Sequence, residues 1–590
     1  RTPAVARMNP STLTRHRWPL VAGAGALVIY ALFFASSYDQ RILTLSGIYV
    51  IMVLGYQFIF GHAGALSLAQ GAFFGVGAYV TGILASKFGT GFVLTFPLSV
   101  AGASMLALIV AVPVLRLASH YFALATLALS QLLLLIAVNW EAVTGGANGL
   151  PGVPPISIGD WQATRGLPLL LFVWGLAVVA MLIARWQLRP ARVAAFTVMR
   201  DTPLAVPAFG IDPGLLRLRA FLLSAAFGGA AGALFVHTNR VVSPETLGFG
   251  VMITCLTMTV VGGRFGILGA VIGALLLTHL PEWFRGLDEY YLVAVGVLLL
   301  AMVVFAPDGL ASFFKFSGST HTPISTPAQP GSTEYAPPVA SGRPVLEASN
   351  MSRRYGGVQA LDGVDLALGA GEIVGLIGPN GAGKTTLANI ITGIARADTG
   401  NIRSAGLDLA RATPTAIARH GVARTFQTPQ LPDGLTVREA VETAAANAGD
   451  TANVRGAATA AEAIATCDLS DIADTRCGTL PHGLRRRVEI ARALAGGPHL
   501  LVLDEPAAGL APEEQAEIAQ ILRTLAGSGL AILVIDHNLE FLQPLATRLA
   551  CLDAGRLIAD GPRDDVLAND AVQAAYFGLV MPTSTSGVSA

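Results

Sequence analysis

Charged side chains are scarce in this sequence. They make up 13% of its 590 residues, whereas a soluble domain carries about 25%. The shortage lies in the first half: residues 1–315 contain 18 Lys and Arg and 10 Asp and Glu, and residues 316–590 contain 20 and 28. The first half is therefore too poor in charge for a soluble domain, and the second half resembles one. The net charge of zero gives no reason to expect a nucleic-acid partner.

Cysteine is also rare, and its placement excludes a CxxC metal or redox motif. The four cysteines are scattered, and we interpret them as reduced structural thiols: Cys255, Cys467, Cys477 and Cys551. A small-residue cleavage site is lacking after the first apolar stretch, which follows Arg15 and Arg17. That stretch is predicted to be a membrane span and not a removed signal peptide. The sequence starts at Arg1 and not at Met, so the true N-terminus stays open.

Long apolar runs dominate the first half. About 20 apolar residues cross the hydrocarbon of a bilayer, and ten segments approach this length. They predict eight to ten membrane helices, since the segments after residue 220 are short and interrupted by glycine. The segments are 18–36, 42–60, 63–86, 93–115, 119–138, 167–186, 220–237, 247–262, 265–281 and 290–307.

The few basic residues of the first half orient these spans. Four arginines precede the first span, and six lie between the end of the sixth span, where Arg185 is its second-last residue, and the start of the seventh. Because cytoplasmic loops collect Lys and Arg, both regions are predicted to face the cytoplasm. With ten spans, the chain after residue 308 also lies in the cytoplasm, and the loop 139–166 lies outside. None of the spans carries a run of charges, so a proton or ion relay is not indicated.

Residues 316–344 are rich in Pro, Ser, Thr and Gly and lack apolar periodicity. Such a stretch cannot bury a core and is predicted to be a flexible linker. After it, short apolar strands alternate with amphipathic helices, a pattern typical of an α/β domain. The predicted organisation is a polytopic α-helical membrane domain over 1–315, a linker over 316–344 and an α/β domain over 345–590.

The most specific motif is EIVGLIGPNGAGKTT, residues 372–386. An apolar strand leads into a match to GxxxxGK[ST], and a helical pattern follows, which is the context of a phosphate-binding P-loop. Backbone N–H groups at the helix N-terminus favour phosphate; Lys384 is expected to reach the β- and γ-phosphates, and Thr385 to ligate Mg²⁺. The predicted cofactors are thus ATP and Mg²⁺. The predicted nucleotide-binding residues of the loop are Gly378, Asn380, Gly381, Gly383, Lys384, Thr385 and Thr386.

LLVLDEP, residues 500–506, supplies two carboxylates after another apolar strand. Alone, such an ending is usually a solvated strand end. Next to a P-loop it predicts that Asp504 binds Mg²⁺ through water and that Glu505 polarises the attacking water.

With these motifs, residues 345–580 resemble the ABC ATPase family, which implies a helical subdomain in the α/β fold. The resemblance implies that Gln427 in ARTFQ senses the γ-phosphate, contributes to the metal site and borders the permease docking groove. It makes His537 in LVIDHN the switch histidine and Tyr355 in RRYGGVQAL the ring that stacks on adenine. Singly, a solvated glutamine, a buried histidine or a core tyrosine would be the simpler interpretations. Their order and spacing favour the functional roles.

The chain departs from the family at its signature motif. LSGGQ appears as LPHGL, residues 480–484, so that Pro481 and His482 replace a serine and a glycine while Gly483 is kept. In the family this segment closes over the γ-phosphate bound by the opposite subunit. Proline removes a hydroxyl and a backbone N–H together, and Ala511 stands where an acidic or amide residue is usual. We therefore expect a working but altered site, with the hypothesis that one composite ATP site is weakened.

Several stretches of residues 42–310 resemble the membrane subunits of the branched-chain (hydrophobic) amino acid uptake family. They are GHAGALSLAQGAFFGVGAYV (61–80), NWEAVTGGANGLPGVP (139–154), SPETLGF (243–249) and VVGGRFGILGAVIGA (260–274). RVAAFTVMRDTPLAVPAFGID (192–212) is similar to the family's cytoplasmic coupling helix, and GVARTFQTPQL and VIDHNLEFL resemble its ATPases. Simple close packing of membrane helices is the alternative explanation for the glycines.

The resemblance implies an ATP-driven importer subunit, a permease fused to its ATPase, in the cytoplasmic membrane with the ATPase in the cytoplasm. It implies a small polar solute such as a branched-chain amino acid, a second copy or a related permease–ATPase chain, an extracytoplasmic solute-binding protein and membrane lipid as partners. Two alternatives remain: an ATP-driven exporter, and an ATP-gated switch that transports nothing. The sequence leaves open the solute, the number of spans and whether two identical chains pair.

Overall fold

The computed structural model describes residues 30, 34–117, 119–284, 290–306, 308–314, 344–448 and 456–577. The predicted span 18–36 and the predicted linker 316–344 therefore lie almost entirely outside the described residues. The chain divides into two compact units. The first comprises residues 1–192 and 214–321, and the second comprises residues 193–213 and 322–590.

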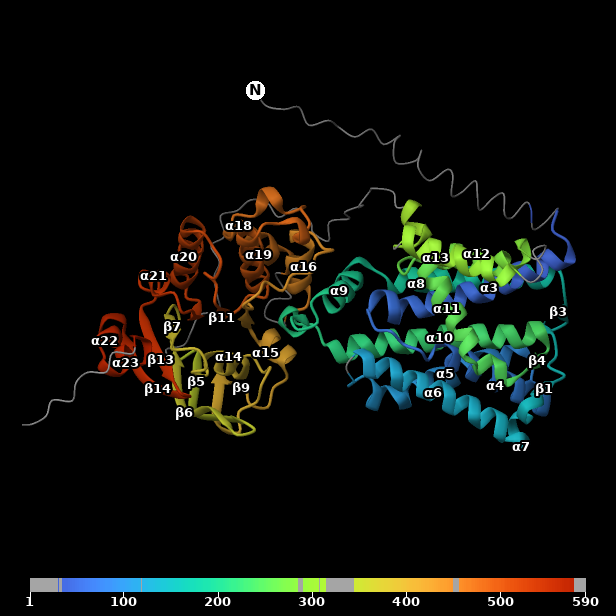
Figure 1. The fold of residues 1–590 in the computed structure, drawn as a ribbon, viewed down its shortest axis with the longest axis horizontal. Helices are drawn as coiled ribbons and strands as arrows, with labels where there is room; N and C mark the ends of the chain where they lie inside the picture. Colours follow the sequence, from blue (N-terminus) through green and yellow to red (C-terminus); the bar gives the residue numbers. More distant parts are fainter. Residues whose placement is uncertain are drawn as a thin grey trace, which may run out of the picture. The chain divides into compact units, whose positions relative to one another are not determined.

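The first unit is a bundle of apolar helices (Figure 1). Within the described residues, six helices are long and apolar enough to cross a membrane, and they correspond to the predicted spans that begin at residues 42, 63, 93, 119, 167 and 220. They are α3 (Ser37–Tyr56, continued by the π-helix η1, Gln57–His62), α4 (Gln70–Phe88), α5 (Phe92–Val114), α6 (Ser119–Asn139), α8 (Leu167–Gln187) and α10 (Pro213–Asn239). Shorter apolar helices follow: α11 (Phe249–Gly262), α12 (Ile267–Trp283) and α13 (Tyr291–Phe305).

Glycines let the helices of this bundle touch through their backbones. A Cβ atom added at Gly77 of α4 would lie 2.3 Å from the carbonyl oxygen of Gly229 in α10, and one at Gly262 would lie 2.7 Å from Cα of Gly273. Such close approach is the usual source of helix association in lipid, where apolar burial gives no advantage.

Two glutamines, which carry no charge, link segments of the bundle by hydrogen bonds. The amide of Gln70 donates to the carbonyls of Met52 and Ser224 (both 3.2 Å), and the Ser224 hydroxyl donates back to it (2.6 Å). Gln57, in η1, donates to the carbonyls of Gly263 and Gly266. These bonds satisfy buried polar atoms without placing an ion in the bundle.

The loop predicted to lie outside contains short elements. They are α7 (Glu141–Thr144), η2 (Gly146–Asn148), β1 (Leu150–Pro151), which pairs with β4 (Val241–Val242), and the hairpin β2 (Ile156–Ile158) and β3 (Trp161–Ala163). A 3-10 turn, η4 (Pro244–Leu247), follows β4.

The second unit is built on a six-stranded sheet with the order β10-β11-β12-β7-β13-β14. The strands are β10 (Val422–Arg424), β11 (Leu500–Asp504), β12 (Ala531–Ile535), β7 (Ile373–Ile377), β13 (Arg548–Asp553) and β14 (Arg556–Pro562). All neighbours are parallel except β13 and β14. Every residue of β7, β11 and β12 is buried, which explains their continuous apolar sequences, because parallel strands are covered on both faces.

An antiparallel sheet and several helices complete the second unit. The sheet has the order β6-β5-β8-β9, from β5 (Leu346–Tyr355), β6 (Val358–Leu368), β8 (Thr399–Ser404) and β9 (Leu407–Asp408). The longer helices are α14 (Lys384–Ile391), α15 (Pro414–His420), α16 (Val437–Ala446), α18 (Gly456–Thr466), α19 (His482–Leu494), α20 (Pro512–Gly527) and α23 (Asp570–Phe577). Helices α16, α18 and α19 pack on one another and form the helical subdomain that the sequence predicted.

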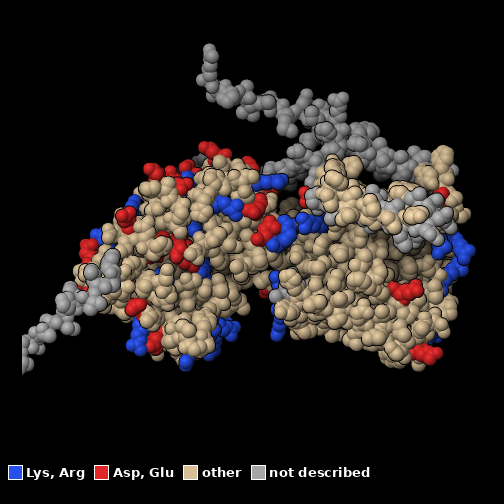
Figure 2. Space-filling view, in the orientation of Figure 1, with Lys and Arg blue, Asp and Glu red and all other residues tan. Residues whose placement is uncertain are grey.

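Residues 193–213, which include all but the first residue of the segment 192–212 that resembles a coupling helix, pack with the second unit although they interrupt the first in sequence. They comprise most of α9 (Pro190–Asp201) and the short 3-10 helix η3 (Val206–Phe209), which contacts α15, α16 and α19. The visible surfaces of the two units also differ in charge (Figure 2). The apolar helical unit is almost bare of charged side chains over its middle, whereas the sheet-containing unit carries both signs.

Candidate nucleotide site

Most of the predicted site residues lie at the ends of four parallel strands of the second unit. The P-loop follows β7, Asp504 ends β11 and Glu505 comes next, His537 comes two residues after β12, and Gln427 comes three residues after β10. Since these strands are parallel, their carboxyl ends lie at the same edge of the sheet. Open α/β sheets bind ligands at this edge.

The P-loop has a backbone that only glycine adopts easily. Gly378, Gly381 and Gly383 have φ angles of 147°, 84° and 103°, in the region that disfavours side chains. Added Cβ atoms at Gly378 and Gly383 would also lie 2.1 Å from the Leu552 carbonyl oxygen and 2.4 Å from that of Ala360. The loop therefore keeps a tight curve that ends at the N-terminus of α14, where the helix dipole favours an anion.

Lys384 opens α14 and places its ammonium group over this loop. Its Nζ donates to the carbonyl oxygens of Gly378 (2.6 Å) and Pro379 (2.9 Å). Burial lowers the pKa of Lys384, whereas the nearby carboxylates of Glu505 and Asp504 act in the opposite direction. An ammonium group held by carbonyl oxygens and close to carboxylates suits a polyphosphate that carries its own metal ion.

The two carboxylates have different surroundings. Asp504 is buried, and its Oδ2 accepts from Nη2 of Arg424 at 2.9 Å. Glu505 has a φ of 48°, a strained backbone for a non-glycine residue and one of the kinds of strain that cluster at active sites. Its Oε2 accepts from Nε2 of Gln427 at 2.8 Å, and its Oε1 lies 3.8 Å from Nδ1 of His537. The structure thus brings Gln427, Glu505 and His537 together.

The oxygen atoms at this edge fit Mg²⁺. Gln427 uses its amide nitrogen on Glu505, which leaves its amide oxygen available, and Asp504 and the Thr385 hydroxyl offer two more hard oxygen donors. Magnesium is usually held by one or two carboxylates together with substrate phosphates. Thr385, Gln427 and Asp504 are therefore a suitable set when a nucleotide supplies the remaining oxygens.

The signature segment begins α19. Pro481 is its N-cap and provides no side-chain bond to the helix. Gly483 is buried against Glu514, since an added Cβ would lie 2.0 Å from Oε1 of that carboxylate. Glu514 in turn accepts from the backbone N–H of Ala511 at 3.0 Å. A fixed carboxylate thus faces the signature glycine.

Tyr355 ends β5 and pairs with Val358 across the hairpin to β6. Its side chain is 46% exposed, so its ring is available to a ligand. Cζ of Arg353 lies 4.6 Å from the ring centroid, which covers part of it by a cation–π contact.

Sequence reasoning missed the buried charges that support this site. Arg486 is fully buried and donates to the carbonyl oxygens of Phe426, Gln427 and Glu505. Glu489 accepts from the backbone N–H of Phe426 at 2.9 Å and pairs with Arg486 at 3.0 Å. Burial raises the pKa of Glu489, and the neighbouring arginines oppose the shift. The available signal was the spacing of Arg486, Glu489 and Arg492, which lie three residues apart on one helix and alternate in sign.

Comparison with known proteins agrees with this geometry. Residues 40–306 match a family model described as the permease component of the branched-chain amino acid transport system, and residues 361–508 match the ABC transporter model. The permease protein LivM of the high-affinity branched-chain amino acid transport system of Escherichia coli is 30% identical over 48% of this chain and 73% of LivM. The chain belongs to this family of ABC transporters, with the permease and the ATPase in one polypeptide.

Other relatives match the ATPase half. The branched-chain amino acid transport ATP-binding protein BraF of Pseudomonas aeruginosa is 34% identical over 40% of this chain and 98% of BraF. The lipopolysaccharide export ATP-binding protein LptB of Escherichia coli is 35% identical over 40% of this chain and 97% of LptB. A nucleotide-free ATP-binding cassette of an ABC transporter is 31% identical over 98% of its chain and 40% of this one, with a TM-score of 0.37.

These findings confirm the predicted family, fold class and location. The transporter is a multi-pass membrane protein. Its second unit, called the ATPase unit from here on, is a cytoplasmic ABC ATPase that binds ATP and couples its hydrolysis to transport. ABC transporters work as dimers of such ATPases, and the family commonly uses a solute-binding protein.

Proposed function

We propose that this chain is the fused permease–ATPase subunit of an importer that moves a small polar solute, an amino acid of the branched-chain or a related type, into the cytoplasm. The observation that carries the proposal is one polypeptide in which a permease of the branched-chain amino acid type precedes an ATPase edge where Lys384, Asp504, Glu505 and His537 meet. The relatives LivM and BraF are named for branched-chain amino acid transport.

The ATPase residues divide the work. The P-loop N–H groups and Lys384 bind the phosphates, with Asn380, Gly381 and Thr386 along the same loop, and Tyr355 stacks on the adenine ring. Thr385, Gln427 and Asp504 would hold Mg²⁺, which would supply neutralising charge to the phosphate oxygens. Glu505 accepts a hydrogen bond from the attacking water, and Gln427 fixes that carboxylate at 2.8 Å. His537 contacts the γ-phosphate beside Glu505.

A second chain completes each nucleotide site. In a head-to-tail pair, ATP bound at Lys384 of one chain faces the segment Pro481, His482 and Gly483 of the other, which is either a second copy or a related permease–ATPase chain. Closure of the pair on ATP drives the permease, because ATP binds the closed state more tightly than the open one. An extracytoplasmic binding protein delivers the solute.

The import direction rests on the permease half. The ATPase half is about equally similar to BraF, named for amino acid transport, and to LptB, named for export, so it does not discriminate between the two. The permease half matches LivM over 73% of LivM, and the resemblance of its membrane stretches to the branched-chain amino acid uptake family favours uptake over the exporter alternative.

The test uses the full chain in lipid nanodiscs and proteoliposomes with Mg-ATP. Glu505→Gln should lower ATP hydrolysis by about 100-fold or more, since general base catalysis contributes this much, and it should retain ATP binding. Lys384→Ala should weaken Mg-ATP binding itself. Glu513→Gln, at an exposed position of α20, is the matched control and should hydrolyse ATP like the wild type.

Direction and solute are measured with radiolabelled leucine as the probe. Leucine should move from the outer side of the permease to the side that carries the ATPase when the matching binding protein and ATP are supplied, and Glu505→Gln should abolish this. Movement of leucine toward the permease's outer side would establish export. If the wild type binds ATP but neither hydrolyses it nor transports leucine, the result would favour the non-transporting switch.

A further inference from the structure

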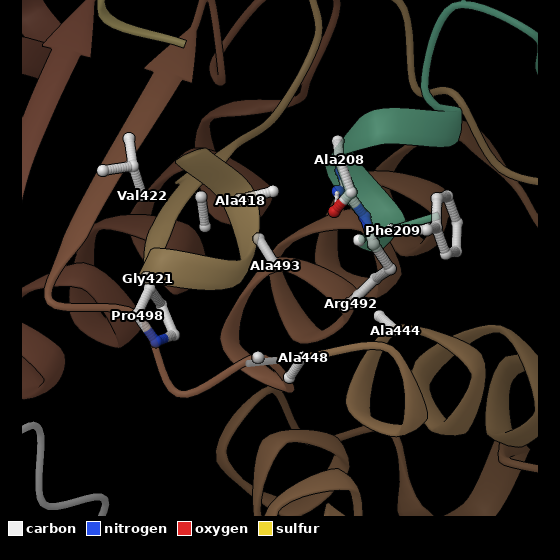
Figure 3. Close-up of a pocket in the computed structure, with 13 residues that line it drawn as sticks. Ala208, Phe209, Ala418, Gly421, Val422, Ala444, Ala448, Arg492, Ala493 and Pro498 are labelled. Carbon is white, nitrogen blue, oxygen red and sulfur yellow. Dashed lines mark hydrogen bonds between the residues drawn. The ribbon is translucent and has the colours of Figure 1, made fainter. Parts of the chain in front are cut away.

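Arg492 connects the segment that follows the coupling helix to the catalytic edge. Its guanidinium is fully buried. Nη1 donates to the carbonyl oxygen of Ala208 (3.1 Å), and Cζ lies 5.0 Å from the centroid of the Phe209 ring. Figure 3 shows Ala208 and Phe209 on η3 beside Arg492, at a small cavity lined mainly by alanine and glycine. Within the ATPase unit, Arg492 thus holds both a carbonyl and a ring of residues 206–210.

From Arg492, two branches lead to the catalytic edge. In the first, Nη2 donates to the carbonyl oxygen of Arg424 (2.9 Å), and the side chain of Arg424 bonds Asp504 (2.9 Å). In the second, Nη2 lies 3.8 Å from Glu489, which pairs with Arg486, and Arg486 donates to the carbonyl oxygen of Glu505 (3.2 Å). Each branch passes through only one or two side chains.

The charge balance of this network depends on residues 206–210. Three buried guanidinium groups, of Arg424, Arg486 and Arg492, meet two carboxylates, of Asp504 and Glu489. The excess positive charge is met by carbonyl oxygens and by the negative face of the Phe209 ring. A buried charge that loses its acceptor is costly. Without Ala208 and Phe209, Arg492 would be drawn to Glu489, which already holds Phe426 and Arg486.

We propose that Arg492 is a positioning residue that links the seating of residues 206–210 on the ATPase unit to the placement of Asp504 and Glu505. Hydrolysis is then fast only when the permease's cytoplasmic segment is in place. The inference rests on the proposed function, because it assigns a role in coupled hydrolysis, but it concerns a buried residue that acts through other residues.

The test measures the kcat and KM for Mg-ATP of the full chain in nanodiscs. Arg492→Lys keeps the charge but loses the planar fork that spans Ala208 and Arg424, and Phe209→Leu removes the ring. Each should lower kcat about tenfold and leave the KM within about twofold, as expected for a residue that positions groups for the reaction. Because both changes act on one contact, the double variant should be no slower than the slower single variant.

Arg487→Lys is the matched control. Arg487 lies on the same helix but bonds Asp468, Glu517 and the Cys467 carbonyl. The kcat of Arg487→Lys should therefore stay within about twofold of the wild-type value. Any of three results would overturn the inference. The kcat of Arg492→Lys and Phe209→Leu could equal that of the wild type, the double variant could lose kcat by the product of the two single losses, or Arg487→Lys could lose as much kcat as Arg492→Lys. If Arg492→Lys does not fold, the kcat of Phe209→Leu alone tests the inference: a tenfold loss supports it and a wild-type value overturns it. A wild type that lacks ATP turnover would instead contradict the proposed function.

Discussion

The two units bury their polar groups in opposite ways. The permease helices bury amides and hydroxyls, such as Gln70 and Ser224, and pack through glycines whose backbones touch. The ATPase unit buries full charges: Arg424 with Asp504, and Arg486 with Glu489. A charge within a bilayer costs several kcal/mol, whereas the interior of a soluble domain accepts one when a partner is close.

This difference shows what each unit needs from its interior. The permease needs helices that fit closely and can change their packing, and neutral ties such as Gln57 to Gly263 allow this at small cost. The ATPase needs carboxylates at fixed places, and buried arginines hold them there. Substitutions that remove a buried partner should therefore be severe in the ATPase unit, and substitutions that add volume should be severe in the permease.

The largest expected effect is the loss of the buried partner of Asp504. Arg424→Met leaves this carboxylate unpaired in the interior and should destabilise the ATPase unit by about 3–5 kcal/mol. Hydrogen exchange at the amides of β10 and β11, in the full chain, measures the loss. Arg556→Met is the control, because Arg556 and Asp362 form an exposed pair worth less than about 1 kcal/mol. If both variants lose the same stability, the buried ion pair does not stabilise the ATPase unit more than the exposed one.

Added volume should do similar damage in the permease. Gly77→Val places carbon atoms on the backbone of Gly229, which cannot move aside like a side chain, so we expect a loss of about 3 kcal/mol. Tryptophan fluorescence during detergent unfolding reports this unit alone, since all six tryptophans lie in residues 1–315. Gly175→Val in α8 has nothing within 4 Å of the added Cβ and should unfold like the wild type. If Gly77→Val unfolds like the wild type, the contact between α4 and α10 is not tightly packed.

The sequence predicted the features that depend on local pattern. Apolar length located the helices from α3 onward, and the P-loop spacing located the cradle at Gly378–Lys384 with its strand and helix. It did not predict that Arg424 pairs with Asp504 or that Arg486 reaches Glu505, because these partners are 80 and 19 residues apart and meet only after the sheet order is set. Nor did it predict Glu514 against Gly483. Pairings across a fold depend on tertiary packing that a single sequence does not encode locally.

A neutral buried histidine should make the ATPase unit sensitive to acid. Burial, with His420 nearby, lowers the pKa of His499 to about 4, and its Nε2 bonds the Ser404 hydroxyl at 2.8 Å. The usual pKa is near 6.5, so below that pH the unfolded chain binds a proton that the folded chain does not. The contribution is complete above pH 6.5 and is lost as the pH falls toward 4; between pH 7 and 5 this amounts to about 2 kcal/mol.

Urea unfolding with pulse proteolysis at pH 7 and pH 5 measures this loss. His499→Gln can still donate to Ser404 but does not titrate, so it should lose about 2 kcal/mol less than the wild type over this interval. The same loss in both proteins would assign the acid sensitivity to other groups.

The smallest expected effect concerns the altered signature. Pro481→Ser restores a hydroxyl and a backbone N–H at the start of α19, and one recovered hydrogen bond to phosphate is worth about 1 kcal/mol, or about fivefold in ATP turnover. The gain should stay modest because Glu514 keeps a negative charge against Gly483. Pro562→Ser is the control, since Pro562 is also a helix N-cap without a side-chain bond, at α22 (Arg563–Leu567), and the turnover of this variant should not change. An unchanged rate in Pro481→Ser would show that the signature does not weaken the site. The rate would then depend on the carboxylates Asp504 and Glu505, which buried arginines hold within the ATPase unit, and not on the signature segment of the second chain.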